Sequence, residues 1–209
     1  MPASTNCCQI NPAVDTMSAI FADSMKPPQI IIRKAATSDV PDIVKMWREM
    51  WEGHARLDPR FTTSGCANEI MEKWIDECIH SERALVLIAE DKTPDLQPTT
   101  LPASIKINSS GIPITRDNSI VGYILALILE NPPVVTEQFY GYISDLSIVE
   151  SHQKKGIGKM LLDEVQGWFK ASKISYAEIN VSVHNAAARG FWLRHGYTPF
   201  LDRMRAEVD

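Results

Sequence analysis

The hexapeptide QKKGIG at residues 153–158 is the feature that most constrains how this chain can fold. It follows the apolar run 142–149, which predicts a buried strand, and it leads into residues 157–169, whose apolar positions recur at the spacing of one helix face. A helix N-terminus presents unpaired backbone N–H groups and a partial positive charge. Glycines let an anion approach that backbone closely, and the lysines add full charges. The order of strand, glycine-rich basic turn and helix therefore predicts a site for a diphosphate group.

Two common phosphate-binding loops do not match this spacing. A Walker A loop would need its first glycine at Gln153 and a hydroxyl residue at Met160. A dinucleotide-binding fingerprint would need a glycine at Leu161. The sequence thus disfavours a nucleoside triphosphatase and a nucleotide-binding switch. A solvated basic turn that binds nothing is the remaining alternative from these residues alone.

The loop resembles the Gln/Arg-x-x-Gly-x-Gly/Ala element of the GNAT acetyltransferase superfamily, which binds the pyrophosphate of acetyl-coenzyme A (acetyl-CoA). A second GNAT element is similar to residues 185–197, which follow an alternating strand pattern at 176–183. Within it, Asn185 suits a helix N-cap and Gly196 suits a helix stop. Two such elements in this order, about 30 residues apart, make the resemblance specific. It covers about residues 30–209.

The resemblance implies an α/β fold with a mixed, mostly antiparallel central sheet that is flanked by helices on both faces. It also implies that acetyl-CoA is the co-substrate, with the Leu146 amide near the acetyl carbonyl and Ile148 near the pantetheine arm. The complete set of expected cofactor contacts is Leu146, Ile148, Gln153, Lys154, Lys155, Gly156, Ile157, Gly158, Lys159, Asn185 and Trp192.

Acetyl transfer from a thioester to an amine needs a base for the amine. Asp145 is the only carboxylate in the central part of the strand before the loop, so we expect it to be that base or to orient the amine. In a regular strand its side chain would point opposite to that of Leu146, and a β-bulge would change which face it reaches. The alternative is a structural carboxylate bonded to nearby backbone.

The chain departs from the superfamily at the proton donor for the leaving thiolate. Trp192 stands where a tyrosine is usual, and an indole cannot act as that acid. Tyr197 is the alternative phenol, although its position also suits core packing. We expect Trp192 to pack on the pantetheine arm.

The remaining pattern predicts one domain, residues 29–209, after a flexible segment 1–28. Strands are expected at 30–33, 84–90, 120–130 and 140–149. One helix is expected after a Ser38 cap with Pro41 in its first turn, and a second carries apolar positions over 70–78. Residues 91–118, with four prolines, read as a loop insertion.

The first helix and the turn 54–61 are the expected wall of the acceptor site. His54, Asp58 and Arg60 are candidates for acceptor contact, and a capped polar turn is the alternative for each of them. The tryptophans of the two helices are expected to pack in the core.

Composition narrows the function classes. A formal net charge of −5 argues against nonspecific binding to nucleic acid or to anionic membranes. The apolar run 120–129 is too short to span a bilayer. The four cysteines form no disulfide framework, which suits the cytoplasm, and the histidines show no metal-ligand spacing.

The sequence therefore predicts a cytoplasmic N-acetyltransferase that uses acetyl-CoA, needs no metal, and acts on a primary amine of a small molecule or a peptide. A homodimer is possible by resemblance. The alternative function is a non-catalytic module that binds acyl-CoA.

Overall fold

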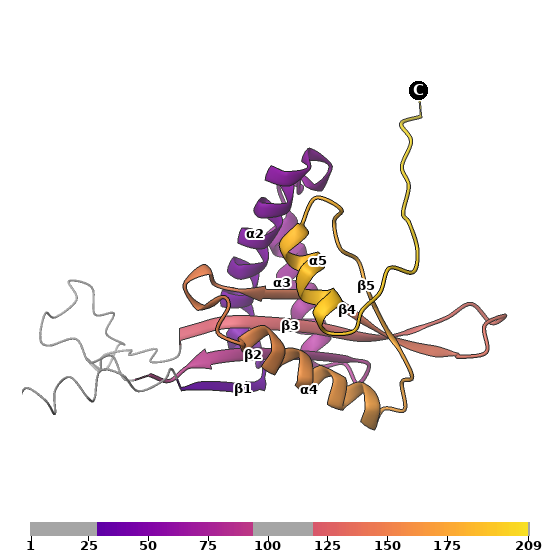
Figure 1. The fold of residues 1–209 in the computed structure, drawn as a ribbon. Helices are drawn as coiled ribbons and strands as arrows, with labels where there is room; N and C mark the ends of the chain where they lie inside the picture. Colours follow the sequence, from indigo (N-terminus) through magenta and orange to yellow (C-terminus); the bar gives the residue numbers. More distant parts are fainter. Residues whose placement is uncertain (1–28, 94–118, 209) are drawn as a thin grey trace, which may run out of the picture.

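A five-stranded sheet, with its strands in chain order, forms the centre of the molecule (Figure 1). The computed structural model describes residues 29–93 and 119–208, so our predictions for 1–28 and for most of 91–118 lie outside it. The first four strands are antiparallel and the last pairs parallel to its neighbour, which confirms the predicted mixed sheet. The strands are β1 (Ile30–Lys34), β2 (Ala84–Asp91), β3 (Ser119–Glu130), β4 (Phe139–Ile148) and β5 (Ala177–Ile179).

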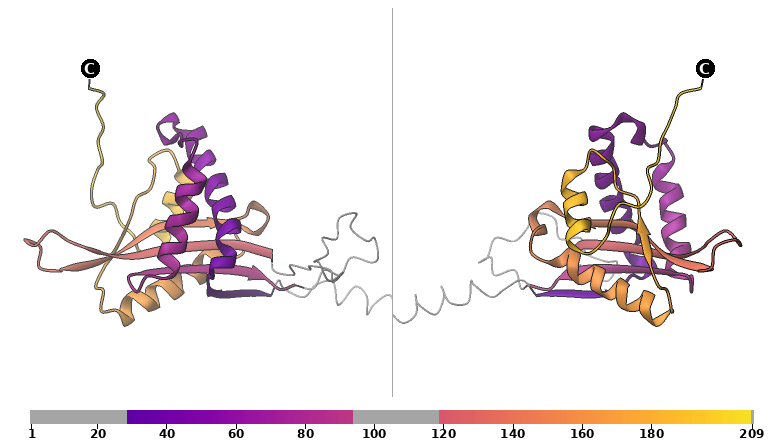
Figure 2. Two further views of the ribbon diagram at one scale, coloured as in Figure 1. Left: turned by 180° about the vertical axis from the view of Figure 1, so that it is seen from behind. Right: turned by 45° about the vertical axis from the view of Figure 1, so that its right-hand side comes forward.

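Helices cover both faces of the sheet. In Figure 1, α4 (Ile157–Ala171) and α5 (Ala186–Arg194) lie in front of the strands. The view from behind in Figure 2 shows α2 (Val40–Leu57) and α3 (Ala67–Ile79) on the other face. Three short 3-10 turns complete the described elements: η1 (Thr37–Asp39), η2 (Pro59–Phe61) and η3 (Glu150–His152).

Each face of the sheet has its own apolar core, because strand side chains alternate between faces. The core under α4 and α5 includes Leu161, Leu162, Val165, Phe169 and Trp192 together with Ile124 and Ile143 of the sheet. The core under α2 and α3 includes Ile43, Val44, Trp47, Ile75 and Cys78 together with Tyr123 and Leu125. The buried Trp47 confirms the packing role predicted for that residue.

The local signals for helix ends are mostly confirmed. The Asn185 side chain accepts a hydrogen bond from the Ala188 N–H at 3.0 Å, as an N-cap does. Gly196 follows α5 with a φ of 87°, the left-handed conformation that ends many helices. The Ser38 cap is wrong: Ser38 lies within η1, and Asp39 is the N-cap residue of α2. The Asp39 carboxylate instead accepts hydrogen bonds from Arg33 and from the Ala36 N–H, which fixes the entry to the helix.

Candidate active site

The sheet opens between β4 and β5. The parallel pairing joins Gly141, Tyr142 and Ile143 of β4 to β5 and ends there. The predicted strand 176–183 is therefore only Ala177–Ile179, because beyond Ile179 the chain no longer has β4 as a partner. Residues 144–148 of β4 keep β3 on one side, so backbone groups on the other side are free of strand pairing.

A β-bulge lies at this opening. Leu125 of β3 pairs with Asp145, whereas the next residue, Ala126, pairs with Ile143, so Ser144 is an extra residue in β4. The extra residue reverses the alternation of side chains. Ile143 and Leu146 both pack toward α4, and Asp145 faces α2 and α3 together with its pair partner Leu125. The β-bulge that the sequence allowed is therefore present. Because of it, the side chains of Asp145 and Ile143 face opposite sides of the sheet.

Asp145 is a buried carboxylate, with 7% of its surface exposed. Burial raises the pKa of Asp145, while a hydrogen bond from Ser144 and the nearby His54 act to lower it. A carboxyl group in this environment is a weaker acid than usual and its ionised form a better base. The site therefore has the chemistry that an amine-deprotonating group requires.

Two phenols lie near this carboxylate. The Tyr123 hydroxyl is fully buried and makes no hydrogen bond with any described residue. Burial and then the charge of Asp145 raise the pKa of Tyr123 well above its usual value. The Tyr142 hydroxyl accepts a hydrogen bond from the Asn180 side chain at 2.9 Å. Both phenols are thus neutral groups around Asp145.

The loop before α4 has the backbone shape expected for binding an anion. Lys154 and Gly156 have positive φ values of 60° and 84°, and such left-handed residues orient successive N–H groups toward one side. No side chain caps the start of α4. The first helical bond runs from the Met160 N–H to the Gly156 carbonyl. The N–H groups of residues 157–159 therefore have no intrahelical partner and are available for phosphate oxygens.

The three lysines of the loop and the start of α4 differ in their surroundings. Lys154 and Lys155 are exposed. The Lys159 ammonium instead donates to Asp163, one turn along the helix, at 2.5 Å. Gln153 points back to the sheet and donates through Nε2 to the Ile148 carbonyl at 3.0 Å. The loop is thereby attached to the open end of β4.

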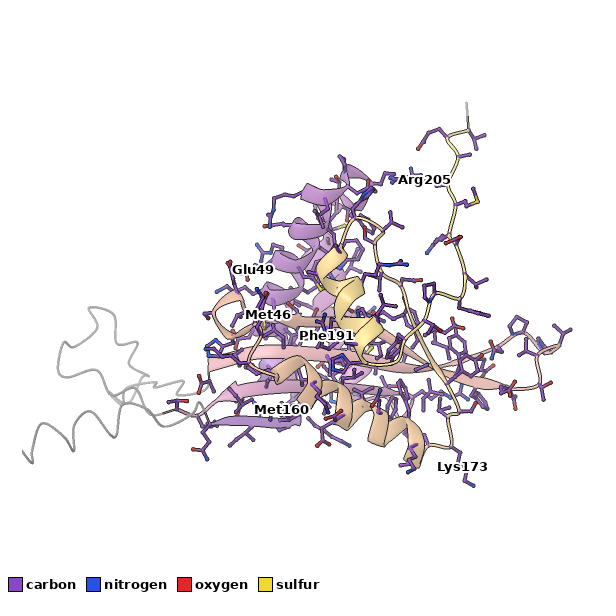
Figure 3. All side chains as sticks on the ribbon, in the orientation of Figure 1. Met46, Glu49, Met160, Lys173, Phe191 and Arg205 are labelled. Atoms are coloured by element: carbon purple, nitrogen blue, oxygen red, sulfur yellow. The ribbon has the colours of Figure 1, made fainter. Side chains whose placement is uncertain are left out.

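Phe191 is the residue that sequence reasoning missed. Its ring, labelled in Figure 3, lies 3.3 Å from the position that a Cβ on Gly158 would occupy. Leu146 of β4 borders the same position at 3.9 Å. Gly158 therefore allows the start of α4, β4 and α5 to approach one another. The signal in the sequence was the first place of an aromatic pair, of which only the second, Trp192, was assigned a role.

Trp192 and Tyr197 pack together on the α4 side of the sheet. Trp192 is buried, with 6% of its surface exposed, and its ring meets that of Tyr197 at 5.0 Å and 72°. Burial raises the pKa of Tyr197, and an interaction with the Gln166 side chain of α4 opposes that rise. Asp145 faces the opposite side of the sheet. The two residues predicted to be catalytic are therefore not brought together, and both aromatic residues serve the core.

The expected acceptor wall divides into two parts. Asp58 and Arg60 form a two-point ion pair, and Asp58 also accepts from the Arg60 N–H, which caps η2. This pair holds the pKa of Asp58 at about 2. His54 lies near Asp145 and donates through Nδ1 to the Met50 carbonyl at 2.9 Å, while its Nε2 has no hydrogen bond to any described residue. The capped polar turn is thus the role of Asp58 and Arg60, and His54 remains at the site.

A family model described as the acetyltransferase (GNAT) family matches residues 87–197, a little over half of the 209 residues. The chain belongs to the GNAT acetyltransferase family. The matched region of this GNAT protein runs from β2 to Tyr197 and contains the opening, the loop and α5. No curated protein matches the sequence significantly.

Solved structures share this GNAT fold at low sequence identity. A tetramutant of the BH1408 protein from Bacillus halodurans is 19% identical, with a TM-score of 0.64 over 85% of this chain and 99% of that chain. A predicted acetyltransferase from Clostridium acetobutylicum, solved with acetyl-CoA, is 14% identical, with a TM-score of 0.62 over 86% and 96%. The aminoglycoside N-acetyltransferase AAC(6')-Iy, in complex with the bisubstrate analogue CoA-S-monomethyl-acetylneamine, is 12% identical, with a TM-score of 0.57 over 87% and 99%.

Within residues 29–93 and 119–208, no three His, Cys, Asp or Glu side chains gather in a group that could hold a metal ion. Over the same ranges, no helix combines the length and the apolar character needed to cross a bilayer.

Proposed function

We propose that this protein is an N-acetyltransferase that moves the acetyl group of acetyl-CoA to a primary amine by direct attack on the thioester. The observation that carries the proposal is the opening of the sheet after Ile143, with the glycine-rich loop 153–158 at one end and the buried Asp145 at its bulge. Such an opening gives an extended cofactor arm access to free strand backbone. The Clostridium acetobutylicum relative in fold binds acetyl-CoA, and AAC(6')-Iy binds a CoA–amine analogue.

The residues present fit acetyl-CoA. The pyrophosphate would meet the free N–H groups of residues 157–159 and the exposed Lys154 and Lys155. The pantetheine arm would lie along residues 146–148 of β4, beside Phe191. An N–H group of the open edge, with Leu146 the candidate, would donate to the thioester carbonyl and stabilise the charge that develops there.

Asp145 has the role of base in this proposal. An attacking amine must be neutral, and an ammonium that enters the site has to lose one proton. The Asp145 carboxylate takes that proton, directly or through water, and its raised pKa makes it a stronger base than an exposed carboxylate. The amine nitrogen then bonds to the acetyl carbon, the carbon–sulfur bond breaks, and the CoA thiolate leaves. The second proton, which the nitrogen loses on becoming an amide, passes through water to the thiolate, so CoA is released as its thiol.

The thiolate needs no strong acid in order to leave. An alkyl thiol has a pKa of about 8.5, so its anion is a fair leaving group near neutral pH. The sequence nominated Tyr197 as the acid, and this stays a prediction. Its contact with Gln166 and its packing on Trp192 already give the Tyr197 side chain a structural role.

A second function, a non-catalytic acyl-CoA-binding module, is favoured by one observation. Trp192 occupies the position where the resemblance places the acid tyrosine, and it is buried in the core. A module of this kind would keep the loop and the open strand edge, and it would not need Asp145.

Thermal melting and thiol release separate these functions. Acetyl-CoA at a hundred times its dissociation constant should stabilise the fold by about 2.7 kcal/mol. Mixing with a panel of primary amines should then release free CoA thiol at a rate that depends on the amine. Stabilisation without amine-dependent thiol release would establish the binding module. A melting temperature that is unmoved by millimolar acetyl-CoA would refute both functions.

A further inference from the structure

An aromatic cluster lies beside Asp145 on the α2 side of the sheet. The rings of Trp51, His54 and Phe61 have centroids between 5.6 and 6.1 Å apart. All three residues are half-buried, so part of each ring is accessible. The C-terminal half of α2, which carries Trp51 and His54, extends past the β4 edge of the sheet (Figures 1 and 2). Trp51 packs against the same apolar core as Leu125, the pair partner of Asp145, which places the cluster beside that carboxyl. His54 also acts to lower the pKa of Asp145.

Asp145 carries the single negative charge among the groups that face it. They are His54 of α2, Cys78 of α3, Tyr123 of β3 and Tyr142 of β4. The pKa of the Cys78 thiol is raised to about 11, mainly by burial, and both phenols also have raised pKa values. None of these four groups is an anion at neutral pH. Asp145 can therefore pair with one ammonium group. A second ammonium group would find no carboxylate among the four groups around Asp145.

Two carboxylates farther out have a guanidinium group in their surroundings. Asp58 is held by Arg60 at 2.5 Å in the capped turn. Glu178 of β5 and Arg203 act in opposite directions on the pKa of Tyr142, so a cation lies near that phenol together with the anion. An acceptor with several ammonium groups would have to compete with these guanidinium groups for those two carboxylates.

We propose that the acceptor is a primary amine with one cationic group carried on a planar apolar body, such as an arylalkylamine, whose ring stacks on Trp51 and Phe61. This inference rests on the proposed function and adds the substrate class. Aromatic faces bind a flat apolar group through offset or edge contacts, and the ammonium at the end of a short alkyl chain reaches Asp145. The proposal differs from the polycationic acceptor class to which an aminoglycoside belongs.

The test compares acceptors at saturating acetyl-CoA by thiol release. The probes are phenethylamine, 2-cyclohexylethylamine, propylamine, spermidine and sisomicin. We expect kcat/KM to be highest for phenethylamine and at least about tenfold lower for spermidine and sisomicin, the size of one lost charge-assisted contact. A preference for spermidine or sisomicin would overturn the substrate class and leave the proposed function standing. Stabilisation by acetyl-CoA without thiol release from any amine would overturn both.

Variants of Trp51 locate the contact. Trp51→Leu should raise KM for phenethylamine about twofold to tenfold, the range of aromatic pair energies, with a smaller change in kcat. Trp51→Phe, which keeps a ring, should restore most of the affinity and controls for folding. Trp74→Leu on α3 removes a half-buried tryptophan outside the cluster and should change neither constant. Equal KM values for phenethylamine in wild type and a folded Trp51→Leu variant would refute the stacking contact.

Discussion

Replacing Gly158 by aspartate tests whether the loop before α4 binds phosphate. The same helix offers a matched control position. Gly158 is the second residue of α4, and Gly167 is an exposed glycine nine residues farther along the same helix. At 1.5 Å per residue the two positions lie about 13.5 Å apart along the axis, which exceeds the Debye length of about 8 Å in physiological salt. Gly158→Asp and Gly167→Asp thus make the same change in net charge at different distances from the bound phosphates.

The magnitude follows from Coulomb's law. A carboxylate in the first helical turn would lie about 5 Å from an anion held by that turn, which corresponds to about 0.8 kcal/mol per phosphate charge in water and about 3 kcal/mol at an effective dielectric constant of 20. With two phosphates, Gly158→Asp should weaken acetyl-CoA binding at least about tenfold, or about 1.4 kcal/mol. Gly167→Asp should change the dissociation constant less than about twofold, because distance and salt both reduce its effect.

Stability separates a binding effect from a folding effect. An acidic residue in the first turn interacts favourably with the helix dipole, by about 0.3–1 kcal/mol. The new Cβ would lie 3.3 Å from the Phe191 ring, a contact that a small ring movement relieves. We therefore expect Gly158→Asp to melt within a few degrees of wild type while isothermal titration calorimetry shows the loss of affinity. If folded Gly158→Asp and Gly167→Asp bound acetyl-CoA with equal dissociation constants, the assignment of the phosphates to this loop would be refuted.

Three further substitutions test the groups around the opening. Asp145→Asn should lower kcat at least about a hundredfold and abolish the acid limb of the pH–rate profile. The dissociation constant for acetyl-CoA should not change. A rate near that of wild type would mean that Asp145 has a structural role only. Because burial raises the folded-state pKa of Asp145, wild type loses stability as the pH rises through that pKa, so Asp145→Asn should melt higher than wild type at pH 8 and close to it at pH 4. Tyr197→Phe should keep kcat within about threefold, and a loss on the order of a hundredfold would restore the acid role. Tyr123→Phe removes a buried hydroxyl without a described partner, so its chemical unfolding should show equal or greater stability, and a loss above about 1 kcal/mol would reveal a partner.

The sequence by itself determined the features that depend on neighbouring residues. The left-handed turn before α4, the Asn185 cap and the Gly196 stop are each encoded within a few positions, because caps and left-handed turns are made by one residue and the next turn of backbone. The positions of the first four strands also followed from apolar runs separated by turns, and the family resemblance implied the mixed sheet. The Ser38 cap was wrong by one residue, because the Asp39 carboxylate is held by Arg33, a contact that only the folded chain makes.

Only the tertiary structure decided the geometry of the opening. The face that Asp145 occupies depends on one extra residue, Ser144, and a bulge is fixed by pairing with β3 rather than by local sequence. The early end of β5 likewise depends on where β4 leaves it. The sequence left Asp58 and Arg60 between acceptor contact and a capped polar turn, and their mutual ion pair forms that capped turn. Long-range pairing sets each of these features, and a single sequence carries no direct record of which distant residues meet.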